Sequence, residues 1–459
     1  MPVSVVSFVH DLRFADLPEP VVAQATRCLL DLVGVAAAGR KTDLSRIVHD
    51  HAARHYGAGS GGRGARLLFD GRRVSPLGAA LAGASTIDSF DAHDGHVLTK
   101  GHMGVAVLPA VLALIDDGLA ADGRELLTNM VLGYEVATRA GMALHATACD
   151  YHTSGAWNAL ACAGLGAKLM RLDAARTREA LGIAEYHGPR SQMMRCIDHP
   201  TMVKDGSGWG ALAGLSAAYL AADGFTGAPA LTVESPEVAE VWGDLGSRWR
   251  ILEQYFKPYP VCRWAQPAVE AAIDLQRGLG LTAHAIDQVE VVTFHQGVRL
   301  AARTPRTTEE AQYSLPFPVA AALVRGTLGA SEIGAAGLTD PKILNLSRSM
   351  ILRESEAYNA RFPAERWAHV VFHFADGTAV ESEPAVARGN PENPLDDREL
   401  TAKYRALTVP LIGPQRSALI EAAVAGLAAD DGTLEELLTD LTLPLAREAH
   451  RLDAIPGAA

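Results

Sequence analysis

An almost unbroken helical pattern over residues 20–227 constrains the fold of this chain more than any other feature. Ala, Leu and Val recur there at three- and four-residue intervals, separated by short Gly, Asp or Pro punctuation. The pattern predicts helices at 21–38, 77–87, 105–117, 124–144 and 209–222, with few strands. Residues 77–84 and 209–220 carry Ala and Gly on more than one face, as helices do when other helices surround them.

The pattern changes after residue 265. Residues 289–294 and 369–374 are β-branched or aromatic runs, and Asp376-Gly377 before Val380 is a hairpin signal. Helical patterns at 315–325 and 341–350 lie between them, 389–397 resembles a linker, and helices return over 399–445. We therefore predict a mainly α protein with an inserted α+β domain. Residues 1–265 and 397–459 would form a discontinuous large helical domain, and 266–396 the smaller α+β domain.

Composition excludes several classes of protein. The 459 residues suggest about three folding units, or two with one large. Lys and Arg total 41 against 53 Asp and Glu, and the net charge of -12 disfavours nucleic acid and anionic membranes as partners. The five cysteines have no CxxC spacing, and no apolar run reaches the roughly 18 residues that span a bilayer. We expect a soluble cytoplasmic protein.

Histidines gather beside acids in the middle of the chain, where seven of the 16 lie between positions 93 and 199. Imidazole titrates near neutral pH, so such a cluster is suited to moving protons to and from a substrate. Taken singly, His145, His187 and His199 are better explained as surface or helix-capping residues.

Three loops precede helices and could present side chains to an anion. They carry His102, His152 and Lys204. A fourth segment, the proline-punctuated strip 257–264, contains Lys257 and Arg263, which could hold carboxylates. The alternative for this strip is an ordinary basic surface turn.

Together with residues 30–35, 224–227 and 306–314, these segments resemble the MmgE/PrpD family over nearly the whole chain. That family includes dehydratases, a decarboxylase and an epimerase. The resemblance implies a large helical domain, a smaller α+β lid domain, a cleft between them and a homodimer. It implies no metal and no organic cofactor.

The resemblance also assigns residues. It implies catalytic roles for Asp91, His102, His152 and Lys204. Candidate substrate-binding residues are Asp94, His96, Lys257, Cys262, Arg263 and Gln266. The chain departs from the family pattern at four places, where His93 replaces an Asp, Met103 replaces a Pro, residues 262–266 lack a further His, and Phe317 stands at or near a Tyr of the decarboxylase.

These residues favour a cofactor-independent lyase, a hydro-lyase or decarboxylase, acting on a small di- or tricarboxylate. His102 and His152 would move protons, Asp91 would orient an imidazole, and Lys204 would neutralise an enediolate. An epimerase or isomerase of a similar acid is the close alternative, since the departures remove two donors. A metal-dependent hydrolase using His93, Asp94, His96 and His102 is less favoured, and a non-enzymatic binding role least.

Overall fold

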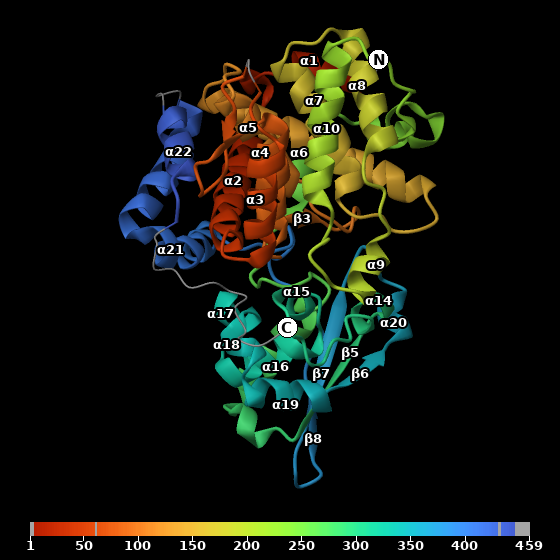
Figure 1. Ribbon diagram of the computed structural model, residues 1–459. Helices are drawn as coiled ribbons and strands as arrows, with labels where there is room; N and C mark the ends of the chain where they lie inside the picture. Colours follow the sequence, from red (N-terminus) through yellow and green to blue (C-terminus); the bar gives the residue numbers. More distant parts are fainter. Residues whose placement is uncertain (1–3, 60–61, 430–432, 446–459) are drawn as a thin grey trace.

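A computed structural model describes residues 4–59, 62–429 and 433–445. It confirms the predicted fold class: a large helical body lies above a smaller α+β unit in Figure 1. The helices of the first half are α1 (Val5–Asp11), α2 (Glu19–Gly39), α3 (Asp43–His55), α4 (Pro76–Asp88), α5 (Gly104–Asp116), α6 (Gly123–Thr147), α7 (Gly155–Leu169), α8 (Ala174–His187), α9 (Met193–Asp198), α10 (Ser207–Ala222), α11 (Leu231–Glu234) and α12 (Ala239–Trp242).

Small residues let the central helices of this body approach closely. α7 and α10 lie side by side, and a Cβ added at Gly214 of α10 would stand 2.3 Å from the carbonyl oxygen of Ala159 in α7. A Cβ at Gly166 would stand 2.5 Å from that of Ala218. The Ala- and Gly-rich pattern thus reflects helix contacts too close for larger side chains.

α2 is the core helix against which the long C-terminal helix α21 packs. By length and composition it could also cross a membrane, contrary to the expectation that no run approaches that length, but 67% of its apolar window is buried inside the protein. α21 (Asp397–Gly426) lies along it (Figure 1) and is followed by α22 (Thr433–Thr442). α21 breaks at Gly413 (φ 79°, ψ 160°), between two prolines that cannot donate to the helix.

The α+β unit is built on one mixed sheet in the order β6-β5-β7-β8, with β9 also pairing with β7. β5 and β6 are parallel and the other pairs antiparallel. The predicted hairpin is confirmed, because Phe372 of β7 pairs with Val380 of β8. The sheet strands are β5 (Gln288–Thr293), β6 (Ile351–Glu354), β7 (Trp367–His373), β8 (Ala379–Glu381) and β9 (Ala385–Val386).

Helices cover this sheet on the side of its buried side chains. β7 alternates buried and half-buried residues, and α13 packs against it. The helices of the unit are α13 (Gln266–Leu279), α14 (His295–Val298), α15 (Thr308–Gln312), α16 (Pro316–Arg325), α17 (Ala330–Ile333), α18 (Ala335–Leu338), α19 (Pro341–Ser349) and α20 (Glu356–Asn359). The proposed domain limits, 1–265 with 397–459 and 266–396, stay a prediction; residues 446–459 lie outside the described part of the chain.

Few strands occur in the helical half, as expected. β1 (Ala65–Arg66) pairs with β2 (Arg73–Val74), and β3 (Gly95–His96) pairs antiparallel with β4 (Gln254–Tyr255). The second pair matters most, because it joins the loop between α4 and α5 to the start of the proline-rich strip. Two segments that carry candidate site residues are thereby held together.

Two glycines of α7 provide a matched test of the close packing. Gly166→Ala should lower the free energy of unfolding by about 1–3 kcal/mol, because the new methyl collides with Ala218. Gly164→Ala should be neutral or stabilising by up to about 1 kcal/mol, since its Cβ would meet only Val9 at 3.5 Å. Urea unfolding followed by circular dichroism measures both, and equal effects would contradict this account of the helix contact.

Candidate active site

The three predicted loop-to-helix junctions meet beneath the N-termini of α5, α7 and α10. Ser154, just before α7, ties them together: its Oγ accepts from the backbone N–H of His102 at 3.0 Å and donates to Asp205 Oδ2 at 2.9 Å. The backbone N–H of Gly155 also donates to the carbonyl of Asp205 at 3.0 Å. The structure therefore brings His102 and the loop of Lys204 to one place.

Asp91 and Lys257 form a buried ion pair at this junction. Lys257 is fully buried, Asp91 is 2% exposed, and the Lys257 ammonium donates to Asp91 Oδ1. Burial alone would raise the pKa of Asp91, but the charges of Lys257 and Lys204 outweigh burial and hold it well below its usual range. Burial likewise opposes the charge on Lys257, and Asp91 outweighs it and raises the pKa of the lysine. Both groups are charged.

Lys204 is a second buried lysine, with 3% exposure and a left-handed backbone (φ 45°). Its ammonium donates to Gln312 Oε1 at 2.7 Å and lies 4.5 Å from the centre of the Tyr313 ring. The same amide oxygen accepts from the backbone N–H of Asp91 at 2.9 Å. The hydrogen-bond acceptor of this ammonium, among the residues described, is thus a neutral amide.

His102 is a neutral imidazole with a defined tautomer. Its Nδ1 lies 2.5 Å from the carbonyl oxygen of Asp94, which can only accept, so Nδ1 carries the proton and the lone pair is on Nε2. Burial, reinforced by the charge of Lys257, lowers the pKa of His102 to about 3. Its ring meets that of His93 edge to face, with centroids 4.2 Å apart. Nε2 is therefore available as a base at neutral pH.

Two further carboxyl groups belong to the cluster, and the sequence reasoning gave neither a role. Burial and repulsion from Asp205 raise the pKa of Asp88 to about 7, and burial and Asp91 raise the pKa of Asp205. Asp88 Oδ2 accepts from the backbone N–H of Ser207 at 3.3 Å, and Asp205 Oδ2 lies 3.7 Å from His102 Nε2. The sequence signal that could have identified them is their position: Asp88 stands three residues before Asp91, and Asp205 directly follows Lys204.

Three predicted residues of the histidine-rich loops make other contacts. His152 Nε2 lies 3.7 Å from Asp150, and its backbone N–H donates to His145, which gives His145 a structural role. Asp94 accepts from Tyr134 behind the loop, and His96 Nε2 lies 3.0 Å from Glu253 Oε2. None of these contacts connects the side chain of His152, Asp94 or His96 to the cluster around Lys204. The roles assigned to these three residues remain predictions.

At the end of the proline-rich strip, side chains stabilise the backbone. The Arg263 guanidinium donates to the carbonyls of Ala387 and Arg388, at 3.2 and 2.7 Å. Gln266 donates to the carbonyls of Tyr259 and Val261. These bonds occupy most of the N–H donors of Arg263 and Gln266, so few remain to bind a carboxylate ligand. Cys262 is buried, and burial raises the pKa of its thiol to about 12, so it is a neutral thiol beside the Asp91 and Lys257 pair.

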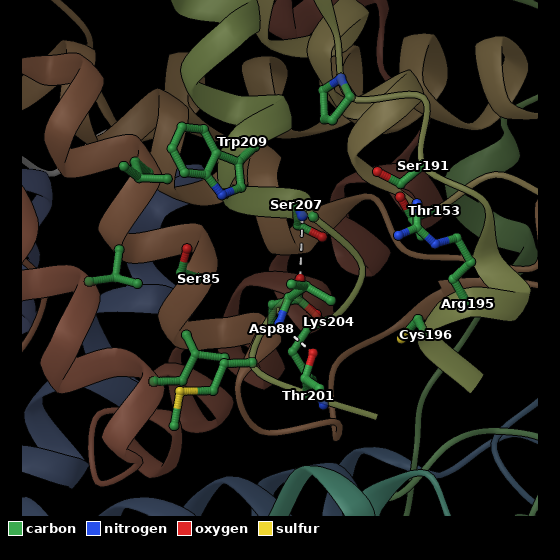
Figure 2. A pocket seen from close by; sticks show the side chains of 18 of the residues that line it. Ser85, Asp88, Thr153, Ser191, Arg195, Cys196, Thr201, Lys204, Ser207 and Trp209 are labelled. Carbon is green, nitrogen blue, oxygen red and sulfur yellow. Dashed lines mark hydrogen bonds between the residues drawn. The ribbon is translucent and has the colours of Figure 1, made fainter. Parts of the chain in front are cut away.

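A cavity of about 850 Å³ opens beside the cluster (Figure 2). Asp88, Lys204, Cys196 and Ser207 form its inner wall. Asp91, His102 and Lys257 do not line it and are connected to that wall through Gln312, His93 and Asp205. At the two other departures from the family pattern, Met103 and Phe317 are fully buried, and Phe317 offers no hydroxyl.

The less favoured alternative, a metal site of His93, Asp94, His96 and His102, is not assembled, since Asp94 contacts Tyr134 and His96 contacts Glu253. A different trio does converge: one ligand atom each of Asp91, His93 and His102 lie within 4.8 Å of one another. However, Asp91 already pairs with Lys257, and the ammonium charge there opposes a cation. Lys257 therefore already neutralises the one charged donor that this trio would offer a metal ion.

Comparisons with known proteins identify the family of the chain. Residues 3–242 match the model of the MmgE/PrpD N-terminal domain, and residues 259–428 that of the MmgE/PrpD C-terminal domain. A cis-aconitate decarboxylase of Aspergillus terreus is 23% identical over 478 aligned residues, which cover 94% of each chain. The cis-aconitate decarboxylase of Mus musculus is 23% identical over 429 residues, covering 88% of this chain and 86% of its own. Both halves of the sequence therefore place this chain in the MmgE/PrpD family.

Proposed function

We propose that the protein is a lyase, a decarboxylase or hydro-lyase, that acts on a small di- or tricarboxylic acid by proton transfer next to a carboxylate, without a cofactor. The observation that carries this proposal is Lys204. Its ammonium is buried, yet its hydrogen-bond acceptor is the neutral Gln312 amide. The charge of Asp91 offsets part of the cost of burying this ammonium, but no carboxylate of the described residues lies within ion-pair distance of it. A substrate carboxylate entering the cavity beside Lys204 would pair with it directly.

The neighbouring groups fit the proton transfers that such a reaction needs. In a dehydration or epimerisation, the substrate carbon would pass the Lys204 wall to reach His102 Nε2, which would remove the proton next to the carboxylate, and the electron pair would move into an enediolate beside Lys204. In a decarboxylation, the bond to the departing CO2 would supply that electron pair and no proton would be removed first. Asp88, on the cavity wall, would act as the acid that protonates a leaving hydroxyl or the carbanion left after CO2 departs. Substrate negative charge would raise the pKa of His102 and so strengthen the base.

The names of the relatives favour decarboxylation, while one feature of this chain keeps epimerisation as a second candidate. Epimerisation removes a proton and returns it to the other face, so one neutral base and one protonated acid suffice. The buried Phe317, which has no hydroxyl, would not be needed for that outcome. Homodimeric assembly and a cytoplasmic location also remain predictions.

Product analysis tests the proposed reaction directly. We expect purified protein to convert cis-aconitate or a related acid with release of CO2 or a change in alkene absorbance. An epimerase would instead release no CO2 and leave the alkene absorbance unchanged. It would change the optical rotation of the acid and incorporate deuterium from D2O. No conversion across a panel of citrate-like and aspartate-like acids would contradict the proposal.

Two substitutions test the assigned roles. His102→Gln removes the base and should lower kcat by roughly 10²- to 10⁴-fold. Lys204→Met removes the charge at the developing enediolate and should lower kcat by roughly 10²- to 10³-fold. Steady-state kinetics measures both, with His295→Gln and Lys342→Met at the exposed surface of the α+β unit as controls of the same chemistry. Normal turnover in either cluster variant would show that its role is wrongly assigned.

The pH profile tests Asp88 as the acid. Asp88 faces Lys204, Asp205, Asp91 and His93, and its pKa of about 7 belongs to a titration shared with Asp205. Because the protonated form is the active acid, kcat/KM should fall above about pH 7. Protonation of His102 should not limit the rate between pH 7 and 5, since its pKa lies at about 3.

Measuring kcat/KM from pH 5 to 9 distinguishes the variants. Asp88→Asn should lower the plateau and remove the fall above pH 7, whereas Asp287→Asn, on the surface of the α+β unit, should leave the profile unchanged. If kcat/KM of Asp88→Asn still falls above pH 7, another group titrates there and Asp88 is not the acid.

A further inference from the structure

A lysine of the C-terminal helix contacts the loop that carries Asp91. Lys403 belongs to α21, which lies along α2 in the helical body (Figure 1). Its ammonium donates to Oδ1 of Asp31 in α2 and to the carbonyl oxygen of Ala92, each at 2.6 Å. Asp31 belongs to segment 30–35, one of those that carry the family resemblance. One side chain thus connects α2 and α21 to the loop between α4 and α5.

The position of the Ala92 carbonyl depends on this ammonium. Ala92 and Asp31 are both buried. A buried carbonyl without a donor is costly, so a loop that loses such a bond rearranges until its carbonyl finds another donor. Burial raises the pKa of Asp31 and lowers that of Lys403, and each charge opposes the effect of burial on the other. Asp31 therefore helps to keep a charged donor next to the loop.

Two residues after Ala92, a tyrosine of α6 holds the same loop. The hydroxyl of Tyr134 donates to Oδ2 of Asp94, and both side chains are buried. The backbone carbonyl of Asp94 accepts from Nδ1 of His102 at 2.5 Å. The carbonyl that fixes the tautomer of His102 therefore lies in a segment that Lys403 holds at Ala92 and Tyr134 holds at Asp94.

A competing acceptor lies on the other side of the imidazole. Oδ2 of Asp205 is 3.7 Å from Nε2 of His102. In a neutral histidine, the hydrogen bond made by one ring nitrogen decides which of the two carries the proton. If the Asp94 carbonyl moved away, the proton would transfer to Nε2 and be donated to Asp205. The lone pair that a base needs would then be lost from Nε2.

We propose that Lys403 and Asp31 are positioning residues that keep the proton of His102 on Nδ1 and its lone pair on Nε2. They act through the backbone of the loop up to the Asp94 carbonyl, and Tyr134 acts with them through the Asp94 side chain. The inference rests on the proposed function, since it takes Nε2 of His102 as the base. The C-terminal helix, far from this loop in the sequence, thereby contributes to the active site.

The tautomer of His102 can be measured without a substrate. In the full chain carrying 15N-labelled histidine, long-range proton–nitrogen correlation NMR distinguishes a protonated from an unprotonated ring nitrogen, and His102→Gln identifies the signals of His102. The unaltered protein should show a protonated Nδ1 and an unprotonated Nε2. The double variant Asp31→Asn with Lys403→Met removes both charges, so it leaves no unpaired buried charge. In it we expect the proton on Nε2, wholly or in exchange with Nδ1.

Kinetics provide the second measurement. Because the base is misplaced while Lys204 stays, kcat of the double variant should fall by roughly 10- to 100-fold and KM should change little. Lys403→Arg keeps the charge and the donors, and should keep the Nδ1 proton and most of kcat. Lys168→Met is the matched control, because the Lys168 ammonium also donates to two backbone carbonyls, of Val9 and Leu12, near the far end of α7. It should lower the melting temperature and leave the tautomer and kcat unchanged.

Failure of the inference and failure of the proposed function give different results. A double variant in which Nδ1 of His102 stays fully protonated overturns the inference, whatever its kcat. If that variant does not fold, Tyr134→Phe decides, since it removes a single oxygen from the support of the same loop, and an unchanged tautomer there overturns the inference. A changed tautomer with normal kcat would support the positioning by Lys403 and contradict the role of His102 as the base. The tautomer decides the inference even if the protein converts no acid.

Discussion

The amide of Gln312 is the contact on which the site depends. Its oxygen accepts from the Lys204 ammonium and the backbone of Asp91, and its nitrogen donates to the Ser89 carbonyl at 3.0 Å and to Thr308. Gln312 ends α15, in the part of the chain matched by the C-terminal domain model, while Lys204 and Asp91 belong to the N-terminal match. The Gln312 amide uses its oxygen for two hydrogen bonds and its nitrogen for two more, and these bonds join the two matched regions at the charged centre. A shift of the C-terminal region would remove the Gln312 oxygen from both the Lys204 ammonium and the Asp91 backbone.

The same centre shows why a protein with net charge -12 can be suited to a small anion. Lys204 and Lys257 lie in one buried cluster, where charges interact more strongly than at the surface. Their field keeps Asp91 ionised and helps to keep His102 neutral, while Asp88 and Asp205 repel each other and retain protons more readily. Breaking a buried pair such as Asp91 and Lys257 typically costs about 3–5 kcal/mol, so these charges support the fold as well as the chemistry.

Periodicity was sufficient to predict most of the fold. Helices α2, α4, α5, α6 and α10 begin and end within a few residues of the predicted limits, and Asp376-Gly377 marks the hairpin of β7 and β8. Of the four residues that the resemblance marked as catalytic, Asp91, His102 and Lys204 lie in one cluster with Lys257 and the His152 side chain contacts Asp150, and the role of each stays a prediction. The contacts of Arg263 and the perturbed Asp88 were not predictable, because they depend on backbone carbonyls and charges from segments far apart in the sequence. A residue type shows what a side chain can bind, but only the folded structure shows which partner lies within contact distance.

The loop before α10 connects the charged centre to the cavity mouth. Lys204 adopts a left-handed backbone at φ 45°, which costs a residue with a side chain roughly 1–2 kcal/mol, and Gly206 follows at φ 65°. This turn directs the Lys204 ammonium inward to Gln312 while Met202 and Val203 remain exposed beside the cavity. Such local strain persists only where surrounding contacts hold it, and here the bonds of Asp205 to Ser154 and Gly155 do so. Lys204 and Met202 are only two residues apart on this strained turn, so one short segment carries both the buried charge and an exposed apolar side chain of the cavity mouth.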